Sequence, residues 1–179
     1  MQDFTNETIN IAELPKFEEV QFQPLHKDYW KIILIGNFIL LLILLLAAGF
    51  LLVFAEERRE NWYFFPIVII IVFLLSVVLG RISFKKRGYA FRQHDVLYRS
   101  GIISETTTII PYSRIQHVAL HEGVISRMFG LASVEIFTAG GGDSDIEIPG
   151  IEKEKAQSLK QLLLTKLSME MANSTLENE

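Results

Sequence analysis

Two long apolar runs, separated by a short polar link, constrain the fold of this chain most. The first run extends over Ile32–Ala55 with one polar interruption, Asn37, and the second extends over Trp62–Leu79. As α-helices they reach about 36 Å and 27 Å, against a hydrocarbon core of about 30 Å. Because the link at 56–61 is so short, the sequence predicts an antiparallel hairpin of two transmembrane helices within 25–81.

A cleaved signal peptide is the alternative explanation of the first run. However, the run is longer than the apolar core of a signal peptide, and it begins only at Ile32, after a long polar segment. The lysines and arginines set the expected orientation, because they favour the cytoplasmic side of a membrane. Two basic residues, Arg58 and Arg59, lie in the link, whereas seven lie close to the other ends of the runs: Lys27, Lys31, Arg81, Lys85, Lys86, Arg87 and Arg92. We therefore expect a multi-pass protein of the cytoplasmic (inner) membrane with both termini in the cytoplasm.

Composition excludes several functional classes. The chain has no cysteine, which rules out disulfides, thiolate metal sites and cysteine nucleophiles. Half of the residues are hydrophobic and only 21% are charged, which argues against a disordered chain and against an ordinary soluble domain. The net charge of −4 disfavours a nucleic-acid binder. The spans contain no ionisable residue, so transport is also disfavoured.

One polar pair is expected inside the hairpin. Asn37 and Ser76 lie at similar depth near the inner ends of the two spans, so a hydrogen bond between the helices is a reasonable hypothesis. The alternative is that Asn37 faces the interfacial region or the cytoplasmic domain.

The rest of the chain divides into a tail, a β-rich domain and a helix. Residues 1–24 are polar and predict a mobile cytoplasmic tail, in which Phe17, Val20 and Phe22 could form a short extended docking segment. Short β-type runs follow the second span. A helical period over Glu152–Met169 predicts a helix that covers the sheet. We place the domain at residues 82–172 and a frayed end at 173–179. The predicted strands are 89–92, 96–99, 102–110, 115–120, 131–138 and 146–148.

Several ordered pieces of this domain resemble a known family. They are Ile110-Pro111, Arg114 to Val118, Arg127 to Leu131, and Thr138 to Gly141, with a similar hairpin from Arg92 to Gly101. Together they resemble the pleckstrin-homology-like (PH-like) domain of bacterial YdbS-type membrane proteins. The resemblance implies a strongly bent, barrel-like antiparallel sheet of seven strands with a C-terminal capping helix. It also implies assembly with related membrane proteins, such as a larger multi-domain homologue, or self-association, and it implies no established enzymatic activity.

The motif residues have structural explanations beside functional ones. Pro111 is expected to end a strand, and a bulge or bend is expected between Ile115 and Val118. Arg114 and Arg127 could hold a barrel corner or bind a phosphate. We expect the motif to be structural or partner-binding; its residues are Pro111, Arg114, Ile115, Gln116, Val118, Arg127, Gly130, Thr138 and Gly140.

A basic cluster after the second span gives the strongest binding hypothesis. Lysines and arginines at this position are attracted to anionic headgroups by about 1 kcal/mol each, although they could also serve topology alone. The candidate lipid-binding residues are Arg81, Lys85, Lys86, Arg87 and Arg92.

Metal chemistry is a weaker alternative. His117, His121 and Glu122 could contribute to a zinc site, but no further ligand is evident. Asp143, Asp145 and Glu147 alternate as on a solvated strand edge. We predict no cofactor, no nucleic-acid partner and no small-molecule substrate. The predicted function is a non-enzymatic, membrane-anchored module that scaffolds a membrane protein complex; the alternatives are anionic-lipid recognition or handling and, less favoured, a membrane enzyme.

Overall fold

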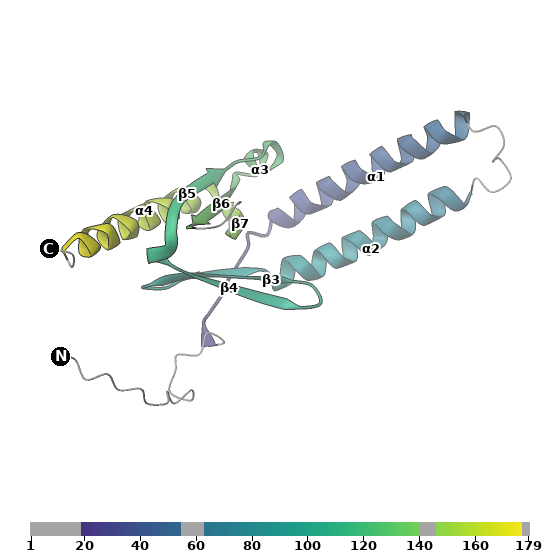
Figure 1. The fold of residues 1–179 in the computed structure, drawn as a ribbon. Coiled ribbons are helices and arrows are strands. Elements are labelled where there is room, and N and C mark those ends of the chain that lie inside the picture. Colours follow the sequence, from purple (N-terminus) through teal and green to yellow (C-terminus); the bar gives the residue numbers. More distant parts are fainter. Residues whose placement is uncertain (1–18, 55–62, 140–145, 177–179) are drawn as a thin grey trace.

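A computed structural model describes residues 19–54, 63–139 and 146–176 of the chain. Two long helices, α1 (Tyr29–Phe54) and α2 (Phe64–Lys86), pack side by side and project from one end of a β-rich domain (Figure 1). Both are long and apolar enough to cross a membrane, over Tyr29–Leu51 and Phe64–Lys86. No residue of α2 is fully buried within the chain, and most of its apolar side chains are exposed. The helical hairpin is as predicted, but α2 continues to Lys86, beyond the domain boundary expected at residue 82.

The domain consists of two antiparallel sheets. The first has the order β1-β2-β3-β4, and the second has the order β5-β6-β7. This mainly-β architecture with a C-terminal helix agrees with the PH-like expectation, except that two sheets take the place of one continuous barrel. The strands are β1 (Gln23–Pro24), β2 (Gly88–Phe91), β3 (Asp95–Gly101), β4 (Glu105–Pro111), β5 (Ile115–His121), β6 (Leu131–Thr138) and β7 (Ile146–Glu152).

The strand β1 precedes the membrane hairpin in the chain, whereas all the other strands follow it. Gln23 pairs with Tyr89 and Pro24 with Gly88, so β1 adds to the edge of β2. The preceding Phe22 lies under the Arg99 guanidinium, 4.4 Å from the ring centroid. The predicted mobile tail therefore ends earlier than residue 24, because its last residues are ordered by this pairing. Phe17 lies outside the described residues.

One predicted strand start was wrong. The β-branched run over residues 102–110 does not form a single strand: β3 extends to Gly101, residues 102–104 turn, and β4 begins at Glu105. Gly101 has φ of +137°, and a Cβ there would lie 1.9 Å from the Ser104 carbonyl oxygen. A glycine is therefore required at this tight turn. The β-branched residues that follow it made residues 102–104 resemble part of a strand.

Two helices complete the domain. The short α3 (Val124–Met128) has Phe129 as its C-cap, and the following Gly130, with φ of +66°, closes the turn that leads into β6. The long α4 (Lys153–Leu176) buries Ala156, Leu163 and Leu167 in the core between the sheets. This helix extends past the predicted end at Met169, and the predicted fraying from residue 173 falls within it.

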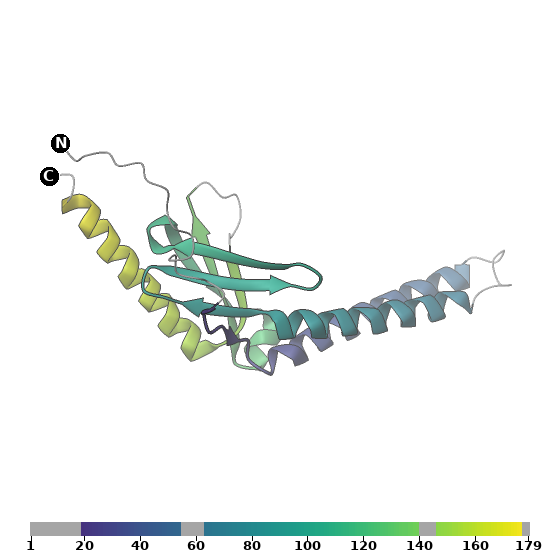
Figure 2. The same ribbon diagram turned by 90° about the horizontal axis from the view of Figure 1, so that it is seen from below.

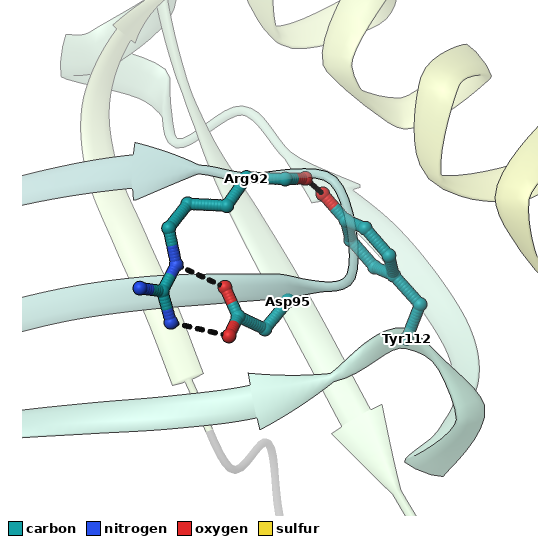
Figure 3. Close-up of polar contacts among 3 residues, drawn as sticks. All are labelled: Arg92, Asp95 and Tyr112. Carbon is teal, nitrogen blue, oxygen red and sulfur yellow. Dashed lines mark hydrogen bonds and ion pairs between the residues drawn. The ribbon is translucent and has the colours of Figure 1, made fainter. Parts of the chain in front are cut away.

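A polar corner of three residues, Arg92, Asp95 and Tyr112, lies at the turn between β2 and β3 (Figure 3). The Arg92 side chain forms a bidentate ion pair with the Asp95 carboxylate, with Nε to Oδ1 at 2.6 Å. The Tyr112 hydroxyl donates to the Arg92 carbonyl at 2.7 Å, while its ring is almost fully buried. Burial, with a smaller effect of the Asp95 charge, raises the pKa of Tyr112. The corner therefore links the β2–β3 turn to the segment that joins the two sheets.

Candidate membrane and partner interface

The root of the hairpin is clamped to the domain. The ring of Tyr29, the first residue of α1, packs directly on Gly150 of β7, where a Cβ would lie 2.5 Å from the Tyr29 Cγ. The His26 amide donates to the Gly150 carbonyl at 2.9 Å, and Leu25 is buried in the core. These contacts, together with the β1–β2 pairing, fix the direction in which the two helices leave the domain.

The basic cluster divides into residues held by the chain and residues open to solvent. Arg81 is exposed, although its guanidinium stacks on Trp30 at 4.9 Å. Lys86 is held by the Ile102 carbonyl and the Glu105 carboxylate, both at 3.0 Å. Lys85 is exposed. Arg87 is half-buried, and its Nε has no hydrogen-bond partner. Of the five candidates, Arg81 and Lys85 are the most open to a headgroup.

Arg92 does not share this location. The extended strand β2 separates it from the end of α2, which corresponds to about 17 Å along the chain. This distance exceeds a Debye length of about 10 Å, and the side chain is already paired with Asp95. We therefore leave Arg92 out of the candidate lipid surface and assign it to the polar corner.

A half-buried tyrosine, Tyr98, lies near the C-terminal end of α2. Burial raises the pKa of Tyr98, which the positive charge of Arg87 partly offsets and the negative charge of Glu147 reinforces. Tyr98 and Arg87 thus share a poorly solvated site at the hairpin root, which keeps the phenol neutral.

The two polar residues of the spans meet. The Ser76 hydroxyl lies 2.9 Å from Asn37 Oδ1 and 2.8 Å from the Phe73 carbonyl, so its single proton is shared between them. Asn37 Nδ2 donates to the Ile33 carbonyl at 3.0 Å. The contact joins α1 to α2 by a hydrogen bond in an otherwise apolar interface.

Part of the sequence motif lines a groove between the two sheets. The groove has a volume of about 250 Å³ and is bounded by the last half of β4, by Arg114 and by the end of β6. Within the described residues, β4 pairs only with β3, so its other backbone edge is open beside this groove. An extended peptide could add to such an edge. The lining residues are Thr108, Ile109, Ile110, Pro111, Arg114 and Thr138.

The other motif residues have separate positions. Ile115 and Val118 are core residues, and a register shift after Ile115 provides the expected bulge. Gln116 is exposed on β5. Arg127 extends from α3 with its side chain 71% exposed, 4.0 Å from the Glu122 carboxylate. Gly140 lies outside the described residues.

Two of the three residues considered as metal ligands, His117 and Glu122, have other contacts. His117 stacks on Phe137 with ring centroids 4.1 Å apart, and Glu122 pairs with Lys153 at 3.0 Å. Within the described ranges, no three His, Asp or Glu side chains gather closely enough to hold a metal ion. Asp143 and Asp145 lie outside those ranges.

Comparison with known proteins assigns the family. Residues 31–167, which include both membrane helices and nearly the whole domain, match the family described as Bacterial PH domain. The chain belongs to this family. No solved structure matches the chain significantly. The bacterial PH domain family is not a known enzyme class.

Two relatives of this bacterial PH domain protein come from Bacillus subtilis (strain 168). The transmembrane protein YdbS is 32% identical over 83 residues, which cover 46% of this chain and 50% of YdbS. The transmembrane protein YdbT is 28% identical over 86 residues, covering 44% of this chain but only 17% of YdbT. The matches thus span half or less of each relative. The relatives and the two apolar helices together show that this is a membrane protein.

Sequence reasoning missed three exposed apolar residues near the hairpin root: Ile103, Val124 and Met128. Ile103 was hidden in a run that resembled a strand, although the glycine before it marked a turn. Val124 and Met128 lie on α3, and their i, i+4 spacing could have shown that they share one face.

Proposed function

We propose that this protein is a non-enzymatic scaffold of the cytoplasmic membrane, with both termini in the cytoplasm, which binds a related PH-like membrane protein through its domain. The observation that carries the proposal is the open β4 edge beside the groove. A partner strand placed there would gain backbone hydrogen bonds along β4, and Arg114 would supply a charged contact at the end of the groove.

The rigid root supports this function. Binding at a protein surface costs less when the surface is already ordered. Because Tyr29 and the β1–β2 pairing hold the domain on the hairpin, the groove has a fixed position relative to the two membrane helices. A partner anchored in the same membrane diffuses only within the membrane plane and approaches this surface in a restricted range of orientations.

The relatives indicate the partner class. One organism contains two proteins, YdbS and YdbT, which both match part of this chain and differ in length. A cell therefore can hold several chains of this type. We propose that the partner is a longer membrane protein with PH-like domains or, failing that, a second copy of this chain.

The test is a gentle detergent extraction of the tagged full-length chain from its native membranes, followed by identification of stoichiometric partners. Thr108→Arg places a long charged side chain in the groove, and Thr106→Arg is the matched control, on the same strand but outside the groove. We expect Thr108→Arg to lose a PH-like partner that Thr106→Arg retains. Equal recovery with both variants, or the lack of any PH-like partner or self-association, would overturn the proposal.

A second candidate, recognition of anionic lipid, is favoured by the exposed Arg81 and Lys85 at the inner end of α2. It predicts that one anionic lipid species stays with the purified chain in native mass spectrometry and is lost from an Arg81→Gln, Lys85→Gln variant. Retention of the partner protein in that variant would separate this function from scaffolding.

A further inference from the structure

The most exposed apolar side chains of the domain lie at one end. Outside the two membrane helices, the described large hydrophobic residues include three that are at least 80% exposed: Ile103 at 98%, Met128 at 81% and Val124 at 80%. The other exposed ones, Ile109, Leu162 and Leu164, reach only 41–47%. Large apolar side chains that are this exposed indicate an interaction surface.

Ile103 lies on the turn between β3 and β4, which we name the β3–β4 tip (residues 102–104). Gly88, which lies just beyond the end of α2, pairs with Arg99, so the chain from Arg99 to Ile102 returns about 10 Å alongside the helix. That length equals about seven helical residues and places the tip level with Arg81. The bond from Lys86 to the Ile102 carbonyl fixes the tip beside the helix.

Val124 and Met128 have an i, i+4 spacing on α3 and therefore share one face, which we name the α3 tip. This tip lies at the start of α1, where the Lys31 ammonium is 5.9 Å from the Phe129 ring centroid. Both views show the β3–β4 turn and α3 at the end of the domain from which the hairpin leaves (Figures 1 and 2).

The level of both tips coincides with the expected membrane surface. Lys31 directly precedes the apolar part of α1, and Arg81 is the first charge after the apolar part of α2, where it stacks on Trp30. Tryptophan and basic side chains are typical of the headgroup layer. Exposed cations also accompany the α3 tip, because the side chains of Lys31 and Arg127 are 61% and 71% exposed.

We propose that the domain inserts the β3–β4 tip and the α3 tip into the lipid leaflet next to it, one beside α2 and the other beside α1. The occupant of this apolar surface is the bilayer that the hairpin already spans, because the tips continue the lipid-facing surface of the helices at the level of the interfacial residues. Apolar side chains at such positions enter the boundary between headgroups and acyl chains. This anchoring orients the domain and is independent of the protein partner proposed above.

The test uses the lack of cysteine in the chain. Single cysteines replace Ile103, Val124 or Met128 in the full-length protein, carry a nitroxide label, and are placed in phosphatidylcholine nanodiscs. The matched control is Gln93→Cys, an exposed position on the β2–β3 turn at the far end of the domain. Because all four sites are exposed, the substitutions leave the core unchanged.

Collisions with oxygen, which concentrates in the acyl region, are compared with collisions with a water-soluble nickel chelate. We expect labels at positions 103, 124 and 128 to gain oxygen contact and lose nickel contact relative to position 93. Labels that behave like position 93 would overturn the proposal and leave the tips as a protein-binding surface. Immersion seen only when anionic lipid is added would also contradict it, since apolar insertion does not require charge.

Discussion

Replacing Gly150 by alanine tests the clamp between the hairpin and the domain. Gly150 has φ of +66°, a conformation that costs a residue with a Cβ about 1–2 kcal/mol. The new Cβ would also lie 2.5–2.9 Å from the Cγ, Cβ and Cδ2 atoms of Tyr29. The backbone of α1 fixes the Tyr29 Cβ, so a change of rotamer can move Cγ and Cδ2 but cannot relieve the overlap with Cβ. Overpacking of this kind costs about 1–3 kcal/mol more.

Gly130→Ala is a control that isolates the backbone contribution. Gly130 has the same φ of +66°, but no atom lies within 4 Å of the position that its Cβ would occupy. We therefore expect a loss of stability of about 1–2 kcal/mol for Gly130→Ala and of about 2–5 kcal/mol for Gly150→Ala. The difference measures the contact with Tyr29.

Amide hydrogen exchange of the full-length chain in nanodiscs gives the local readout. The His26 amide, which bonds the Gly150 carbonyl, reports the clamp, while the Lys153 amide, which bonds the Gly130 carbonyl, reports the control site. Since about 1.4 kcal/mol is a factor of ten, protection of His26 is expected to fall about 30-fold or more in Gly150→Ala. Adding Tyr29→Ala removes the overlaps with Cγ and Cδ2 and keeps only the one with Cβ, so the double variant is expected to lose less protection at His26 than the two single variants together. Equal effects of the two glycine substitutions on His26 would refute the clamp.

Two further predictions concern the polar corner and the membrane helices. Tyr112→Phe removes the bond to the Arg92 carbonyl and is expected to cost about 1 kcal/mol in urea unfolding at neutral pH. Because the pKa of Tyr112 is raised in the folded state, its contribution to the free energy of unfolding is complete below pH 10.0 and is lost as the pH rises through the folded pKa. Tyr112→Phe is expected to reduce this loss of stability at alkaline pH. An unchanged pH profile would contradict the assignment. Ser76→Ala is expected to weaken packing of α1 on α2 by about 0.6 kcal/mol, measured by thermal unfolding in detergent. An effect no larger than that of Val77→Ala would show that the hydrogen bond does not stabilise the hairpin.

The sequence was sufficient for the elements whose signal is local. Continuous apolar runs locate α1 and α2, since every side chain of a membrane helix faces lipid or the other helix. The positions of β5 and β6 follow from β-branched runs bounded by Pro111, Gly123 and Gly130. The helical period of α4 follows from its need to bury Ala156, Leu163 and Leu167 against the sheets.

The failures involve contacts between residues far apart in the chain. Gln23-Pro24 carries no strand signal of its own, and it is extended because β2, which follows both membrane helices in the chain, offers a free edge. The basic cluster shows the same difficulty. Charge counting cannot distinguish Arg92, which pairs with Asp95, from Lys85, which is exposed, although both lie in one basic stretch.

The residues of the sequence motif serve different purposes in the folded domain. Pro111, Arg114 and Thr138 come together at the groove, whereas Ile115 and Val118 fill the core and Arg127 lies near the membrane-facing end. A linear motif therefore mixes residues that fold the domain with residues that are open to a partner or to lipid. Only the three-dimensional positions separate these groups and direct the substitutions to Thr108 and Ile103.

The position of the hairpin in the chain explains how the domain is mounted. Because α1 follows β1 and α2 precedes β2, and because β1 pairs with β2, the two membrane helices start from neighbouring strands of one sheet. The sheet thus holds the helix roots next to each other, which lowers the entropy lost when α1 packs on α2. The same arrangement requires that any tilt of the hairpin be transmitted to β1, β2 and, through Tyr29, to β7. A domain mounted by one flexible linker would lack this coupling, so the clamp at Gly150 and the two apolar tips act together to set one orientation of the groove on the membrane.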